Sequence, residues 1–125
     1  MTTTPLPPKT ATKTARELLL HAAELVSGER ARTHGDMVEN HQNIADLWNG
    51  YLGDKLTVSL TPTDVALMQV LLKIARTKLG DLNGDDFMDI AGYGSVAWQI
   101  ASHIAEQTST RVDDAADWRI MPPWL

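Results

Sequence analysis

The segment from Val65 to Ala75 constrains the fold most strongly, because nine of its eleven residues are apolar and the exceptions are Gln69 and Lys73. Such a composition predicts a helix that is apolar around most of its circumference and therefore buried on most sides. The preceding Thr61-Pro62-Thr63-Asp64 supplies an N-cap, a proline at the first helical position and an acid in the first turn. Around this helix we expect an all-α fold.

Three further helices follow from apolar periodicity and from capping residues. Asp36 is placed to cap the helix that begins at Met37, and Asp85 to cap the helix after the Asp81–Gly84 turn. The helices are expected at about residues 15–27, 37–51, 62–78 and 85–107. We therefore predict a four-helix domain over residues 15–107, with a flexible arm at 1–14 and a tail at 108–125 that docks through its tryptophans.

Composition excludes several classes of protein. The 125 residues contain no cysteine, so disulfides, thiolate zinc sites and cysteine nucleophiles are ruled out. A net charge of −5 argues against a dedicated binder of duplex DNA, which needs a basic face. The arm and the first residues after it carry Lys9, Lys13 and Arg16, and three basic residues are few for a nucleic-acid-binding surface. No stretch approaches the roughly 20 apolar residues of a membrane span, so we expect a cytoplasmic protein.

Three polar residues, Gln69, Lys73 and Arg76, share one face of the central helix because they follow i, i+4, i+7 spacing. One interpretation is a thin stripe that faces solvent. The other is a cationic stripe lining an internal cleft, which requires anions opposite because lysine and arginine are rarely buried without a partner.

The last helix supplies candidate anions. Asp86 and Asp89 fall on its apolar face, three residues apart, and buried carboxylates need partners. The partner is either Lys73 or Arg76 in an internal ion pair, or a divalent metal ion, which takes oxygen ligands from paired carboxylates. The remaining alternative is that they are first-turn acids favoured by the helix dipole.

The second helix and the segment before it are less decisive. Asn40 lies at the edge of the apolar stripe and is expected to make a half-buried polar contact, while His41, inside the stripe, is expected to be a satisfied core residue. Arg30, Arg32 and His34 cluster before this helix and either hold a phosphate or form ordinary surface charge.

Several strings then resemble the MazG-like, all-α nucleotide pyrophosphohydrolases, in a branch of small phage-type proteins. The resemblance covers about residues 28–97, and its most specific parts are Lys73-Ile74-Ala75-Arg76 and Asp89-Ile90-Ala91-Gly92-Tyr93. It implies a helical bundle that forms homodimers or homotetramers. It also implies a phage enzyme of the nucleotide pool in the host cytoplasm, hydrolysing purine dNTPs to monophosphate and pyrophosphate.

The resemblance also implies the residues of the site. In that superfamily Mg²⁺ or Mn²⁺ is held by EExxE and ExxD motifs. Asp86-x-x-Asp89 matches the ExxD motif, with Asp in place of Glu. Glu39-Asn40-x-x-Asn43 has the spacing of the EExxE motif but retains only one of its acids. The implied metal ligands are Glu39, Asp86 and Asp89, with Lys73 as a further catalytic residue. The implied substrate contacts are Arg32, His34, Asn40, Asn43, Trp48, Lys73, Arg76 and Tyr93.

A different class of function fits the same residues. In a non-catalytic helical interaction protein, Lys73 and Arg76 pair internally with Asp86 and Asp89, and the tryptophan-rich tail binds a partner. In the first hypothesis the carboxylates bind a metal ion, and in the second they stabilise the fold.

Overall fold

The computed structural model describes residues 5–27 and 36–108, and these residues contain helices but no strand. The α-helices are α1 (Ala15–Ser27), α3 (Met37–Leu52), α4 (Pro62–Arg76) and α5 (Gly84–Thr108). Two short 3-10 helices, η1 (Lys9–Ala11) and η2 (Gly53–Lys55), precede α1 and follow α3. The prediction of an all-α fold with four helices is confirmed.

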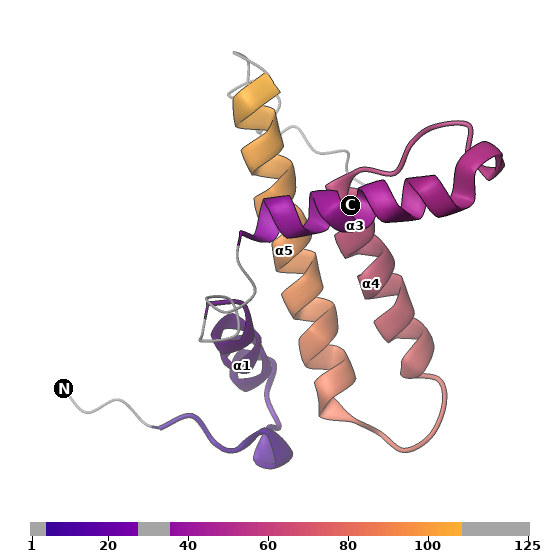
Figure 1. Ribbon diagram of the computed structural model, residues 1–125. Helices are drawn as coiled ribbons and strands as arrows, with labels where there is room; N and C mark the ends of the chain where they lie inside the picture. Colours follow the sequence, from indigo (N-terminus) through magenta and orange to yellow (C-terminus); the bar gives the residue numbers. More distant parts are fainter. Residues whose placement is uncertain (1–4, 28–35, 109–125) are drawn as a thin grey trace, which may run out of the picture.

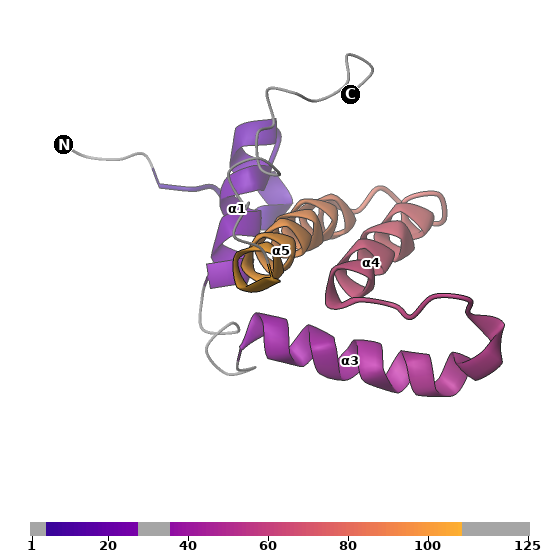
Figure 2. The same ribbon diagram turned by 90° about the horizontal axis from the view of Figure 1, so that it is seen from above.

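The helices α4 and α5 form an antiparallel pair that is the centre of the fold (Figure 1). Helix α3 runs across this pair and contacts both members. Helix α1 packs against α5 on the side away from α4, so that α5 lies between α1 and α4 when the molecule is seen from above (Figure 2). Helix α5 therefore contacts each of the other three α-helices.

Local capping chemistry explains where the helices begin. Thr61 and Asp64 form a complete capping box at α4, with Pro62 in the first turn. At α3 the Asp36 side chain accepts hydrogen bonds from the backbone N–H groups of Val38 and Glu39, at 2.7 and 3.1 Å. Both N-caps agree with the sequence.

The start of α5 differs from the prediction. We expected Asp85 as the N-cap, but the helix already includes Gly84. The residue that accepts a bond from this turn is Asn83, whose Oδ1 lies 3.0 Å from the backbone nitrogen of Asp85. Asparagine and aspartate are equivalent N-cap residues, so the one nearer to the turn takes this role and Asp85 becomes an exposed first-turn acid.

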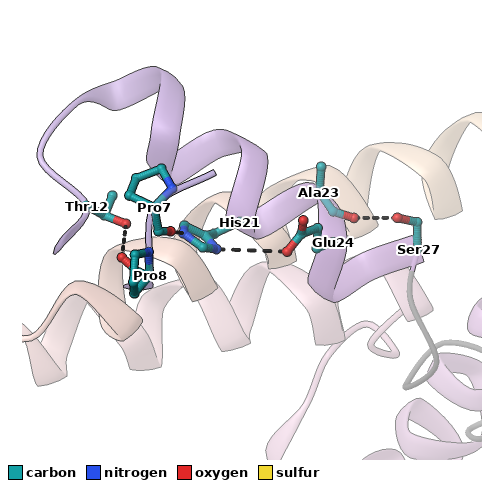
Figure 3. Close-up of polar contacts among 7 residues, drawn as sticks. All are labelled: Pro7, Pro8, Thr12, His21, Ala23, Glu24 and Ser27. Carbon is teal, nitrogen blue, oxygen red and sulfur yellow. Dashed lines mark hydrogen bonds and ion pairs between the residues drawn. The ribbon is translucent and has the colours of Figure 1, made fainter. Parts of the chain in front are cut away.

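Part of the predicted flexible arm is attached to α1. The Thr14 hydroxyl accepts a bond from the Glu17 backbone, and Glu17 accepts bonds from the backbones of Lys13 and Thr14. Further along, the buried His21 ring lies with Nε2 2.7 Å from the Pro7 carbonyl oxygen, and Glu24 is on its other side (Figure 3). The segment that precedes α1 thus folds back along it. The predicted docking tail at 108–125 lies almost entirely outside the described residues.

The core consists of small and branched side chains where three helices meet. Ala66 of α4 packs with Val96, Ala97 and Ile100 of α5, all of them buried. Partly buried residues from α1, α3 and α5 surround this cluster, namely Val26, Met37, Val38 and Ile104. Alanine at the crossing allows α3, α4 and α5 to approach closely, which fixes the relative positions of their polar residues.

One expectation about α4 is wrong for the single chain. We predicted burial on most sides, but the fully buried residues are Pro62, Val65 and Ala66, all at the beginning of the helix. Much of the remaining apolar surface of α4 is exposed, at Leu67, Met68, Leu71, Leu72 and Ile74. The helices in residues 5–27 and 36–108 are too few to cover α4 on all sides.

No helix among the described residues is long and apolar enough to cross a membrane.

Candidate functional site

Two ion pairs join α4 to α5 at the end of the hairpin nearest the turn. The first is formed by Lys73 and Asp89, with Nζ 3.0 Å from Oδ2. The Lys73 side chain is 15% exposed and that of Asp89 30% exposed, so both charges are largely withdrawn from water. A lysine in such a position requires an anion, and the structure supplies it.

The second pair lies one turn away along both helices. Arg76 Nε is 3.8 Å from Asp86 Oδ1, a distance too long for a hydrogen bond. The Asp86 side chain is 12% exposed, whereas that of Arg76 is 60% exposed. The more buried carboxylate is thus neutralised by a cation that remains accessible from solvent.

These contacts decide between the two interpretations of the cationic stripe on α4. Lys73 and Arg76 line the inner side of the hairpin, opposite acids, and are not a stripe that faces only solvent. The i, i+3 spacing on each helix matches in the antiparallel pair, so Lys73 meets Asp89 and Arg76 meets Asp86. We call these four residues the hairpin charge cluster.

The structure does not bring Glu39 to this cluster. Glu39, Asn40 and Asn43 of α3 line an open groove of about 1030 Å³ together with His103 and Gln107 at the end of α5. His103 comes 17 positions after Asp86 on the same helix, which corresponds to about 25 Å along its axis. The resemblance implies that Glu39, Asp86 and Asp89 bind one metal site. Within one chain, however, Asp86 and Asp89 lie together and Glu39 lies far from them.

The other predicted site residues divide similarly. Asn40 is exposed, contrary to the expected half-buried contact, because it points into the groove rather than into the core. His41 is buried, with Nδ1 2.8 Å from the Met37 carbonyl oxygen, as expected of a satisfied core histidine. Trp48 and Tyr93 are half-buried. Arg32 and His34 lie outside the described residues.

The groove contains residues that the sequence analysis did not single out. His103 is exposed on α5 and lines the groove beside Gln107, opposite Asp46 and Gln42 of α3. The sequence gives little indication that His103 lines a groove, because an isolated histidine on the polar face of a long helix resembles an ordinary surface residue. Its position opposite α3 depends on how the helices cross.

The donor set of the hairpin charge cluster fits a magnesium ion in part. Mg²⁺ in nucleotide enzymes is commonly bound by one or two carboxylates, with water and substrate phosphates completing the shell, and Asp86 and Asp89 are two carboxylates on one helix. In residues 5–27 and 36–108, no three His, Cys, Asp or Glu side chains are grouped so that they could hold a metal ion. Phosphate oxygens would thus have to complete the site.

Comparison with known proteins gives the family of the chain. Residues 17–101, more than half of the sequence, match DUF6378, a domain of unknown function. The chain therefore belongs to the DUF6378 family, and the matched segment contains the whole hairpin charge cluster together with Glu39.

Two phage proteins are similar in sequence. The Gene 55 protein of Mycobacterium phage L5 is 47% identical over 79 residues, which are 63% of this chain and 49% of that protein. The Gene 55 protein of Mycobacterium phage D29 is 34% identical over 103 residues, 82% of this chain and 66% of that protein. The chain thus spans about half to two thirds of the length of these relatives. No solved structure matches it.

Proposed function

We propose that the chain is a metal-dependent nucleotide pyrophosphohydrolase, which converts a (deoxy)nucleoside triphosphate to the monophosphate and pyrophosphate. The observation that supports this most is the hairpin charge cluster, in which two carboxylates and two cations lie together between α4 and α5. A magnesium–triphosphate complex presents the complementary charges, since the metal ion attracts carboxylates and the phosphates attract lysine and arginine.

Each residue of the cluster has a role in this proposal. Asp86 and Asp89 would hold Mg²⁺ or Mn²⁺, which when bound supplies charge neutralisation and an activated water. Lys73 and Arg76, released from the carboxylates, would neutralise phosphate oxygens. Arg76 is suited to capture the substrate first because its side chain is already mostly exposed. Glu39 remains a candidate ligand only if it comes from another molecule of the chain.

The phage relatives support one part of the proposal, the phage origin of the chain. We infer a phage enzyme that acts on purine dNTPs in the cytoplasm of the infected host and forms homo-oligomers. Two Gene 55 proteins of mycobacteriophages are similar to the chain, which supports the phage origin in this proposal.

The experiment is a pyrophosphate-release assay with the full chain and each of the eight common NTPs and dNTPs. It is run with Mg²⁺, with Mn²⁺ and with EDTA. We expect metal-dependent release from at least one nucleotide, and loss of that release in Asp86→Asn and Asp89→Asn. Asp85→Asn is the matched control, because Asp85 is the exposed neighbour of Asp86 on the same helix and should keep full activity.

Two results would refute the proposal. One is the absence of pyrophosphate from all eight nucleotides with either metal. The other is activity that survives both Asp86→Asn and Asp89→Asn, because the carboxylates would then have no part in the reaction.

A second function, a non-catalytic interaction protein, is favoured by a specific observation. Both carboxylates of the cluster already have a cation as partner, and Glu39 lies near the other end of α5. In that case the cluster serves only to hold α4 against α5. This alternative predicts that neither Mg²⁺ nor any nucleotide changes the melting temperature.

A further inference from the structure

The outer side of α4 is an exposed apolar surface that the proposed function does not use. Its side chains Leu67, Met68, Leu71, Leu72 and Ile74 are 38–64% exposed. Of these, Leu67, Leu71 and Ile74 project away from Val65 and Ala66, which are buried against the rest of the molecule. Figure 2 shows α4 at the edge of the helical assembly, with α5 beside it and α3 across its beginning. We call these five residues the outer α4 face.

Isolated exposed leucines are ordinary, but a contiguous aliphatic face on a helix is not. Between Val65 and Ala75 the one charged residue is Lys73, and it is turned inward to Asp89. The outer α4 face thus carries no charge that would keep it in water. Leu67, Leu71 and Ile74 follow i, i+4, i+7 spacing, the arrangement of a seam that packs against another helix.

We propose that the outer α4 face binds a second copy of the same chain, with the two α4 helices antiparallel across a two-fold axis near Leu71. A two-fold contact requires a surface that is complementary to itself. An uncharged aliphatic seam meets this requirement, because its pairing with an identical seam brings no like charges together.

The charges at the two ends of the seam support this choice of partner. Asp64 and Lys78 lie seven positions before and after Leu71. In an antiparallel pairing centred on Leu71, Asp64 of each copy faces Lys78 of the other. The same symmetry that buries the leucines therefore places opposite charges at both rims, where they favour correct register.

The outer α4 face has the composition of the core of a dimer interface, because it is exposed, aliphatic and uncharged. Stable interfaces bury about 800 Å² on each partner, with an apolar centre and a polar rim. The outer α4 face supplies the centre. Leu79 and Leu82, in the turn after α4, are also exposed, at 80% and 91%.

The test is the mass of the full chain in solution, measured by light scattering on a sizing column, for three variants. We expect the unaltered chain to be a dimer at micromolar concentration. Leu71→Glu should raise the dimer dissociation constant at least about 30-fold, the minimum effect of a hot-spot residue. Leu47→Glu is the control, because Leu47 on α3 is equally exposed at 66% but lies outside the outer α4 face.

A second measurement tests the same contact without introducing a charged side chain. The chain has no cysteine, so Leu71→Cys introduces one thiol per molecule, which should form an intermolecular disulfide readily if Leu71 lies near the two-fold axis. Leu47→Cys should not. A chain that stays monomeric at 100 micromolar would overturn the proposal. So would a dimer that withstands Leu71→Glu and does not cross-link through Cys at position 71, since another face would then form the dimer.

Discussion

Lys73 Nζ of α4 lies 3.0 Å from Asp89 Oδ2 of α5, and both side chains are largely shielded from water. A contact of this kind stabilises the hairpin only while both partners are present, because each leaves a poorly solvated charge if the other is removed. The pair therefore couples the stability of the α4–α5 hairpin to the residues of the candidate site.

A double-mutant cycle on this pair should show strong coupling. We expect Asp89→Asn to lower the free energy of unfolding by about 1–3 kcal/mol, because it leaves Lys73 without its anion. Lys73→Met should cost less, since Asp89 is the more exposed partner. Urea denaturation of the single and double variants measures the coupling. Additivity within about 0.5 kcal/mol would show that the contact contributes nothing.

Metal ions should stabilise the chain if the proposed function is correct. A ligand that binds only the folded state at 100 times its dissociation constant adds about 2.7 kcal/mol. We therefore expect Mg²⁺ or Mn²⁺, with a non-hydrolysable triphosphate present, to raise the melting temperature and EDTA to reverse the change. The combined variant Asp86→Asn/Asp89→Asn should not respond. A metal effect that persists in this variant would assign the binding to other residues.

Asn49 should be important for stability although no function is assigned to it. Its amide donates to the Leu60 carbonyl oxygen at 3.0 Å and accepts from the Leu60 backbone nitrogen at 2.7 Å. These two bonds fasten the segment before α4 to α3. Asn49→Ala should lower the free energy of unfolding by about 1–3 kcal/mol. Asn43→Ala, an exposed position on the same helix, should change it by less than about 0.5 kcal/mol.

Glu17 should make the stability of α1 depend on pH. The backbone N–H groups of Lys13 and Thr14 donate to its carboxylate and lower its pKa from the ordinary value of 4.5. A carboxyl group whose pKa is lower in the folded state stabilises that state above its unfolded pKa. It loses this contribution as the pH falls through the folded pKa. The stabilisation should thus be complete above about pH 5 and decline below pH 4.5.

An NMR titration of the Glu17 side chain measures this pKa directly. Glu17→Gln keeps an acceptor for the cap but has no titrating group, so its α1 helicity should vary less with acid than that of the unaltered chain. A Glu17 pKa at or above 4.5 would contradict the hydrogen bonds that the structure assigns to it.

Local signals in the sequence were sufficient for the helices themselves. Asp36 and the Thr61–Asp64 capping box mark the starts of α3 and α4 because a cap acts within one turn of backbone. The starting residue of α5 was missed by one position, where Asn83 and Asp85 competed for the same role. The attachment of Pro7 to His21 was also missed, because the two residues are 14 positions apart and no periodic pattern connects them.

The sequence by itself determined an all-α chain, the positions of its four helices, and the presence of two acids and two cations at matching i, i+3 spacings. Tertiary structure decided which of these residues meet. It turned Lys73 toward Asp89, placed Glu39 near the opposite end of α5, and left the outer α4 face in solvent. Caps and periodicity act between residues a few positions apart, whereas the meeting of side chains depends on how whole helices cross. That crossing is fixed by packing around Ala66 and Ile100, which no local pattern specifies.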